Sequence, residues 1–155
     1  MANTYTQLYI HIVFAVKYRQ CLLHMRFEED VFKYITGIVQ TKGHKLIAIN
    51  GMPDHIHIFV GLKPKEAISD LVRGIKKDSS KFSNSKNWFN SKFNWQGGFG
   101  AFSYAHSQIS NVANYIANQK AHHKQRAFRE EYLELLAKFQ IESDEKYQFE
   151  WINDQ

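Results

Sequence analysis

The stretch PDHIHIFV, residues 53–60, alternates polar and apolar side chains and organises the rest of the chain. On an extended strand, successive side chains point to opposite faces with a period of two. The aliphatic face of such a strand consists of Ile56, Ile58 and Val60. The opposite face consists of His55, His57 and Phe59. Because imidazole nitrogens on alternate positions of a twisted strand can converge on one ion, the stretch predicts part of a metal site.

The histidine pair alone leaves two interpretations open. In the first, the imidazoles are ordinary surface or hydrogen-bonded side chains. In the second, they are metal ligands, and a third ligand and a reactive neighbour should then occur elsewhere in the chain. His11, in an earlier alternating segment, could approach this site, although a solvent-facing role on its strand is the simpler expectation.

Length and composition indicate one folded domain. The chain has 155 residues, of which 44% are hydrophobic and 15% aromatic, enough to build a core. Its net charge of +5 and pI near 9.2 favour polyanionic partners, but many proteins that bind none share such a bias. The composition therefore permits nucleic-acid binding without establishing it.

The sequence predicts a cytoplasmic protein with no membrane partner. A single cysteine, Cys21, cannot form an intramolecular disulfide, and the first residues lack the basic and apolar regions of a leader. The longest apolar runs are also far shorter than the roughly 20 residues that span a bilayer.

Periodicity predicts the fold class. The segments follow in the order strand, helix, strand, strand, helix, strand, at residues 6–16, 27–41, 44–50, 55–60, 65–82 and 95–104. Asn50-Gly51 is the expected turn of the hairpin between the second and third strands. This βαββαβ order is typical of an α+β, ferredoxin-like sandwich, an antiparallel sheet with helices on one face. We expect the other face to be open, as in sheets that bind nucleic acid.

The remainder of the chain predicts additional helices. A third helix spans residues 107–123, and Tyr115 and Gln119 stand four residues apart on one of its faces. A packing helix follows, with an acidic outer face made by Glu130, Glu131 and Glu134. We expect a single domain over 1–155, divided into a core (1–104), the tyrosine and packing helices (105–142) and a tail (143–155). The aromatic tail, with Tyr147, Phe149 and Trp151, could dock on a partner subunit.

A basic face on the second helix is the candidate DNA surface. Its residues are Arg73, Lys76, Lys77 and Lys81. A solvated helix face explains these charges as well as a surface that follows phosphates does.

Three stretches in this order give the chain a family resemblance. They are HIH at 55–57, WQGGFGAF at 95–102 and YIANQ at 115–119. Together they resemble the HUH single-tyrosine transposases of the smallest bacterial and archaeal insertion sequences, the IS200-like transposase family. The resemblance extends over nearly the whole chain.

The resemblance implies roles for particular residues. His55, His57 and Gln119 would hold a divalent metal ion, Mg²⁺ or Mn²⁺, and Tyr115 would be the nucleophile. The substrate would be single-stranded DNA with hairpins at transposon ends, which such enzymes cleave and rejoin through a 5′-phosphotyrosine. The enzymes would be homodimers with composite active sites, combining the histidine strand of one subunit with the tyrosine helix of the other. His106, His122 and His123 could be further metal ligands or phosphate contacts, but an interaction with a helix end is their default interpretation.

Two other functions fit part of this pattern. A catalytically silent module that binds single-stranded nucleic acid on the same fold would need neither Tyr115 nor Gln119. A zinc hydrolase could use the histidine pair, but the sequence shows no second histidine cluster on a strand. The presence of all four expected site residues favours the transposase.

Overall fold

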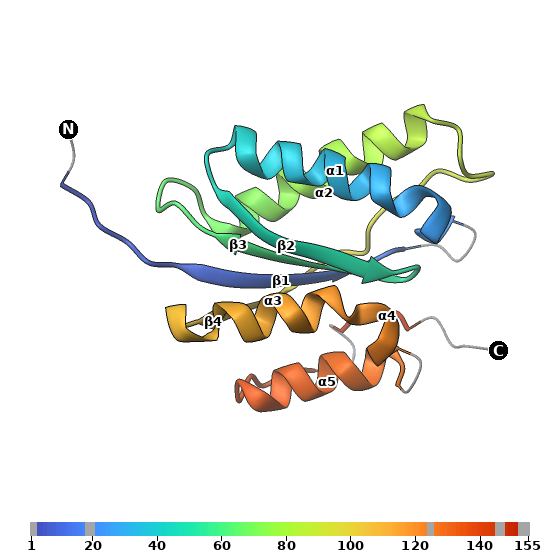
Figure 1. Cartoon of the computed structure of the whole chain (residues 1–155). Helices are drawn as coiled ribbons and strands as arrows, with labels where there is room; N and C mark the ends of the chain where they lie inside the picture. The colour runs from blue at the N-terminus through green and yellow to red at the C-terminus, as the bar shows by residue number, and fades with distance from the viewer. Residues whose placement is uncertain (1–2, 18–20, 124–125, 145–147, 152–155) are drawn as a thin grey trace.

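The computed structural model describes residues 3–17, 21–123, 126–144 and 148–151, and it is built around one antiparallel sheet. The strands lie in the order β2-β3-β1-β4. They are β1 (Tyr9–Ala15), β2 (Lys45–Met52), β3 (His55–Gly61) and β4 (Gly100–Tyr104). Helices α1 (Met25–Thr41) and α2 (Ile68–Ser85) cover one face. On the other face lie α3 (Ile109–Ala117), α4 (Gln119–His122) and α5 (Phe128–Lys138), as Figure 1 shows.

The expected α+β class and the βαββαβ order of the core are confirmed. The alternation in the 53–60 stretch works as predicted, because Ile56, Ile58 and Val60 are fully buried in the main core. The cost of exposing these side chains to water fixes the register of β3, and with it the face on which the histidines lie.

Three expected boundaries differ from the structure. Asn50 and Gly51 do not form the hairpin turn, because β2 continues to Met52, which pairs with His55. The segment expected as a strand from residue 95 makes an isolated bridge between Trp95 and Val16, and the continuous strand β4 begins only at Gly100. The third helix is also interrupted, since α3 ends at Ala117 and α4 begins at Gln119.

The second face of the sheet is covered, so the expectation of an open face is wrong. Phe59 of β3 is fully buried in a second hydrophobic cluster with Val112 and Ile116 of α3. His11 of β1 lies on this face and is also fully buried, so its expected solvent-facing role is wrong too. The helices that follow β4 in the sequence turn this surface into an interior.

The aromatic tail packs on its own chain in the described residues. Phe149 is buried, and its ring lies 5.0 Å from that of Tyr132 and 6.0 Å from that of Phe128 on α5. The side chain of Gln96 fixes the backbone of Glu150 through two hydrogen bonds of 2.7 Å. Tyr147 lies outside the described residues.

Across the described ranges, no helix has both the length and the apolar character needed to cross a membrane.

Candidate metal and tyrosine site

Each of the two histidines of β3 is held by a partner at its Nδ1 atom. His55 Nδ1 lies 2.7 Å from the Asp54 carboxylate, and His57 Nδ1 lies 2.7 Å from His11 Nε2. Both His55 and His57 are fully buried. With Nδ1 occupied in each ring, the Nε2 atoms of His55 and His57 both face the same small region of the interior. Partners of this kind fix the tautomer and the ring orientation of metal-binding histidines.

Glu131 of α5 occupies that region. Its Oε1 atom lies 2.9 Å from His57 Nε2, 3.2 Å from His123 Nε2 and 3.4 Å from His55 Nε2. The residue is only 1% exposed. A carboxylate buried this deeply requires compensating charge or hydrogen bonds, and three imidazoles supply them here.

Tyr115 and Gln119 reach the other oxygen of the same carboxylate. The Tyr115 hydroxyl donates a short hydrogen bond to Glu131 Oε2, and Gln119 Nε2 donates to it over 3.0 Å. The Gln119 amide oxygen lies 3.4 Å from His55 Nε2. The structure therefore brings together the four residues expected from the sequence, and it adds Glu131 at their centre.

Side chains of neighbouring elements hold the interrupted tyrosine helix in place. The Asn50 amide of β2 donates to the carbonyl oxygens of Ile116 and Ala117 at the end of α3, over 3.0 and 3.1 Å. Lys120 of α4 donates to the Gly51 carbonyl oxygen and pairs with Glu28 of α1 at 2.8 Å. The Asn50 bonds satisfy carbonyls at the break and attach α3 to β2, whereas Lys120 attaches α4 to β2.

The surroundings shift the pKa values of the site residues in different directions. Burial raises the pKa of Tyr115, and the adjacent Glu131 carboxylate raises it further. Burial alone would raise the pKa of Glu131, but hydrogen bonds from His123, His55 and His57 hold it far below its ordinary value. In this arrangement the carboxylate is therefore ionised and the phenol keeps its proton.

The donor set suits a divalent metal ion. One ligand atom from each of His55, His57, His123 and Glu131 lies within 4.8 Å of all the others. Nitrogen donors with a carboxylate match the preferences of Mn²⁺ or Zn²⁺. A His/Glu group able to hold a metal is thus present, and two of its members are the histidines expected as ligands.

Sequence reasoning missed the place of Glu131. We expected it on an acidic outer face of the packing helix, and that expectation is wrong. Glu131 follows Phe128 by three residues and precedes Leu135 by four, so it falls on the buried stripe of α5. An acidic residue within an apolar stripe was the signal in the sequence. His123 carried no comparable signal, because it lies at the C-terminal end of α4.

The basic residues of α2 lie away from this site, since α2 covers the opposite face of the sheet (Figure 1). Arg73 is exposed and pairs with Asp70 at 3.4 Å, and Lys77 and Lys81 are exposed. Lys76 has a structural contact, because its Nζ donates to the carbonyl oxygens of Gln96 and Gly98 over 2.7 and 2.6 Å. Burial lowers the pKa of Lys76 to about 8.

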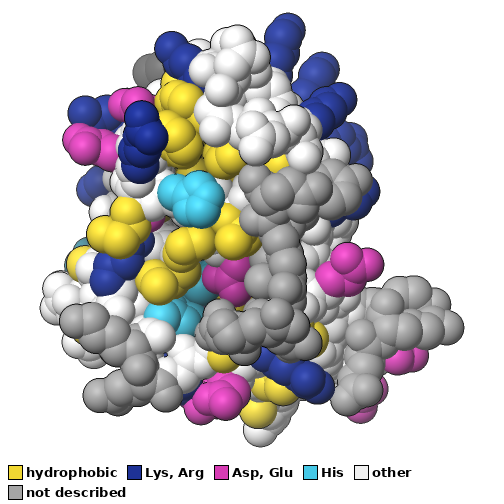
Figure 2. Space-filling model, turned by 90° about the vertical axis from the view of Figure 1, so that its right-hand side faces the viewer, with side chains coloured by type: hydrophobic (Ala, Val, Ile, Leu, Met, Phe, Trp, Pro, Cys, Tyr) yellow, Lys and Arg dark blue, Asp and Glu magenta, His cyan; other side chains and the backbone are white. Residues whose placement is uncertain are grey.

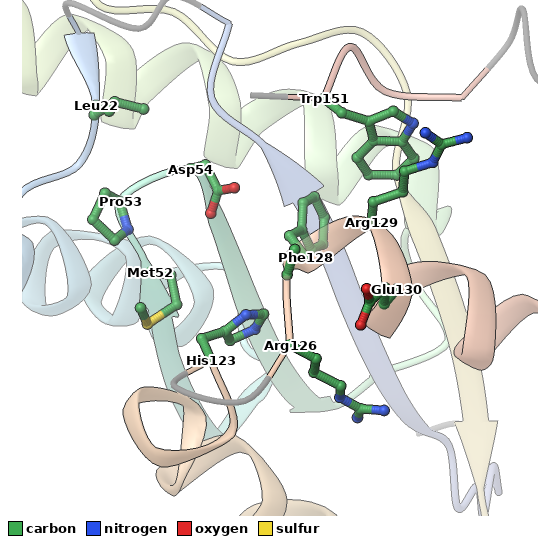
Figure 3. A pocket seen from close by; sticks show the side chains of 11 residues that line it. Leu22, Met52, Pro53, Asp54, His123, Arg126, Phe128, Arg129, Glu130 and Trp151 are labelled. Atoms are coloured by element: carbon green, nitrogen blue, oxygen red, sulfur yellow. The ribbon is translucent and has the colours of Figure 1, made fainter. Parts of the chain in front are cut away.

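Two cavities flank the site. A cavity of about 680 Å³ opens beside His123 and the hairpin turn between β2 and β3. Figure 3 shows Arg126, Arg129 and Trp151 around this cavity together with His123 and Asp54. In Figure 2, which shows the end of the molecule at the right of Figure 1, hydrophobic and histidine side chains gather near the centre.

The second cavity, of about 300 Å³, is lined by the Tyr115 ring itself. Its other walls come from α3, α5 and the end of β4. Tyr115 is thus half-buried and reachable from one side, whereas the histidine pair and Glu131 are enclosed.

Comparison with known proteins places these features in a family. The family model described as "Transposase IS200 like" matches residues 4–119. The match covers well over half of the chain, which therefore belongs to the IS200-like transposase family. Glu131 and the whole of α5 lie beyond the matched residues.

Individual relatives agree with this assignment. The ISDra2 transposase TnpA of Deinococcus radiodurans is 31% identical over 75 residues, which make up 48% of this chain and 54% of that protein. The matched segment thus spans only about half the length of this curated relative.

Two solved structures share the fold. A candidate transposase from Deinococcus radiodurans R1 has a TM-score of 0.60 and 22% identity, over 77% of this chain and 95% of that one. A REP-associated tyrosine transposase bound to a REP hairpin has a TM-score of 0.59 and 17% identity, over 79% of this chain and 73% of that one.

Proposed function

We propose that this transposase cleaves and rejoins single-stranded DNA through a covalent bond to Tyr115, with a divalent metal ion held by His55, His57 and Gln119. One observation carries the proposal. A tyrosine hydroxyl, a glutamine amide and two buried imidazoles converge on the Glu131 carboxylate, although they come from separate elements of the fold. Family membership supports the same reaction class.

The residue types account for the chemistry. In the cleavage step, the Tyr115 oxygen attacks the phosphorus of the scissile phosphodiester and the bond to the 3′ oxygen breaks. The phenolic proton passes to solvent, and the leaving 3′ oxygen takes up a proton from solvent to become a free 3′-OH. A bound Mg²⁺ or Mn²⁺ would neutralise charge on the non-bridging phosphate oxygens. Because the phosphotyrosine ester conserves the bond energy, the 3′-OH of another strand can reverse the attack without ATP.

The enclosed state of the site implies a rearrangement. His57 is fully buried and Glu131 is 1% exposed, so a DNA phosphate cannot reach them directly from solvent. We propose that DNA or the metal ion displaces part of the α3 to α5 layer, and that the arrangement described here is a resting one.

The cavity beside His123 is the proposed path of the DNA strand. Arg126 and Arg129 can contact phosphates there, and the Trp151 ring is partly exposed and available for base stacking. The fold relative bound to a REP hairpin supports folded DNA as a partner for this chain. The exposed Arg73, Lys77 and Lys81 of α2, together with Lys76, stay proposed as a secondary phosphate surface.

We also propose a homodimer with composite sites. Exchange of the tyrosine helices between two copies would rebuild the same contacts between chains. Mixing two inactive variants, Tyr115→Phe and His57→Ala, tests this. A composite site should recover cleavage in the mixed dimer, because one of its two sites contains neither substitution. A mixed dimer without activity would show instead that each chain builds its own site.

A covalent-adduct assay tests the proposed function itself. The wild type, Tyr115→Phe and the control Tyr34→Phe are incubated with Mn²⁺ and single-stranded DNA from the flanks of the encoding locus, then run on a denaturing protein gel. A protein–DNA band should form with the wild type and the control and be absent with Tyr115→Phe. Intact hairpin binding without any band would favour the catalytically silent binding module.

A further inference from the structure

Glu131 divides its two carboxylate oxygens between two groups of partners. Oε1 faces three imidazole Nε2 atoms, from His55, His57 and His123, at 2.9 to 3.4 Å. Oε2 accepts hydrogen bonds from Tyr115 and Gln119. No other acidic side chain in the described parts of the chain belongs to the candidate metal group.

The expected metal set lacks an anionic ligand. His55, His57 and Gln119 are neutral ligands when they bind a metal ion, so this set would leave both charges of a divalent ion unbalanced. The Glu131 Oε1 atom lies 2.9 to 3.4 Å from the three imidazole Nε2 atoms, so its carboxylate can supply a negative charge at the same point.

Packing holds Glu131 in position. Phe128, one turn earlier on α5, stacks on the His55 ring with a centroid distance of 3.9 Å and an interplanar angle of 4°. Tyr132, the next residue along the helix, packs against Phe149 of the tail. The carboxylate thus projects from a helix that is anchored directly on a metal-binding histidine.

We propose that Glu131 is the anionic ligand of the metal ion, binding through Oε1, and that its Oε2 atom positions the Tyr115 hydroxyl beside the ion. This inference rests on the proposed function and extends it to a helix outside the family match. His123 joins the ligand set as a further nitrogen donor, and Gln119 additionally orients the carboxylate through its Nε2. An anionic ligand makes the site a stable metal centre before DNA arrives.

Metal binding measured without DNA tests the proposal. Isothermal titration calorimetry with Mn²⁺ would compare the wild type with Glu131→Gln, which keeps the shape of the side chain but removes its charge. The control Glu130→Gln alters an exposed neighbour on the same helix. Loss of an outer-shell partner weakens metal binding about 10- to 100-fold, and loss of a ligand should weaken it at least as much. Glu130→Gln should match the wild type.

A spectroscopic reading separates ligation from a merely structural role. With Co²⁺ in place of Mn²⁺, the visible absorption of the wild-type complex should change strongly in Glu131→Gln and less in Glu131→Asp, which keeps the negative charge on a shorter side chain. Mn²⁺ should raise the melting temperature of the wild type more than that of Glu131→Gln. If Glu131→Gln does not fold, Glu131→Asp still tests the proposal, because a shorter carboxylate should alter both the affinity and the Co²⁺ spectrum.

Two results would overturn the inference in distinguishable ways. Unchanged Mn²⁺ affinity and Co²⁺ spectrum in both Glu131 variants, with binding still abolished by His57→Ala, would remove Glu131 from the ligand set but leave the proposed function intact. If the wild type binds neither metal ion, the metal site itself is wrong, and the inference fails with it.

Discussion

His11 allows a test of how the proposed metal site is held in place. It is fully buried on β1, and its Nε2 lies 2.7 Å from His57 Nδ1. Burial and the neighbouring His57 lower its pKa well below the ordinary value, so it is neutral at neutral pH. We expect His11→Leu to remove the group that fixes the tautomer and orientation of the His57 ring.

The structure sets the size of the two expected effects. Losing an outer-shell partner of a metal-binding histidine costs about 10- to 100-fold in metal affinity, or about 1.4 to 2.7 kcal/mol. Folding stability should change far less. His11 Nδ1 has no hydrogen-bond partner among the described residues, so the substitution removes one unsatisfied buried atom while leaving His57 Nδ1 as another. Each such atom costs about 1 to 3 kcal/mol, and the two contributions largely cancel.

The assay combines Mn²⁺ calorimetry with thermal unfolding of the metal-free protein. His106→Leu is the matched control, because His106 is exposed and its ring contacts only Tyr9 among the ring pairs found in the described residues. His11→Gln, which keeps a hydrogen-bonding group, should lie between the wild type and His11→Leu. Mn²⁺ affinity of His11→Leu within twofold of the wild type, in a folded protein, would refute this reasoning.

Two further predictions concern stability. A Cβ at Gly100 would lie 2.9 Å from the Tyr132 ring, so Gly100→Ala should lower the free energy of unfolding by about 1 to 3 kcal/mol. The control Gly97→Ala has open space around it and should change the free energy of unfolding by less than about 1 kcal/mol. Urea unfolding measures both values. The hydrogen bond with His44 holds the pKa of Glu66 below its ordinary value. Stability from this pair is present above the ordinary glutamate pKa and is lost as the pH falls through the lowered one, so Glu66→Gln should flatten the loss of melting temperature between about pH 6 and pH 3. An unchanged pH profile would contradict this.

The elements that the sequence predicted well are those with a strong local period. Alternation placed Ile56 and Ile58 in the core and His55 and His57 on the other face, because burial of the aliphatic side chains fixes the register. The four-residue spacing of Tyr115 and Gln119 likewise predicted that both side chains share one helix face. Both reach the Glu131 carboxylate although the helix is interrupted between α3 and α4.

At the hairpin between β2 and β3, strand pairing overrides the local turn preference of the sequence. Asn50-Gly51 is a strong turn sequence, yet Gly51 pairs with Ile56 inside the ladder. Continuing β2 by two residues adds backbone pairs to the sheet and brings Asp54 beside His55, where it holds the ring. The turn therefore falls at Pro53 and Asp54.

The covered face could not be predicted from local patterns. His11 and Glu131 are buried only because α3 to α5 fold back over the sheet, and no periodicity within one segment reports a contact between residues far apart in the chain, such as His57 and Glu131. The apolar stripe of α5 did contain a clue at Glu131, but a carboxylate on a buried stripe becomes interpretable only once its partners are known.

Mass spectrometry can locate the proposed covalent bond between DNA and Tyr115 directly. Wild-type protein is treated with Mn²⁺ and a single-stranded substrate from the flanks of the locus, digested with nuclease and protease, and its peptides are sequenced. We expect a nucleotide phosphate on the peptide containing Tyr115, absent when Mn²⁺ is removed. A nucleotide on any other residue, or cleavage of the substrate without a covalent adduct, would contradict it.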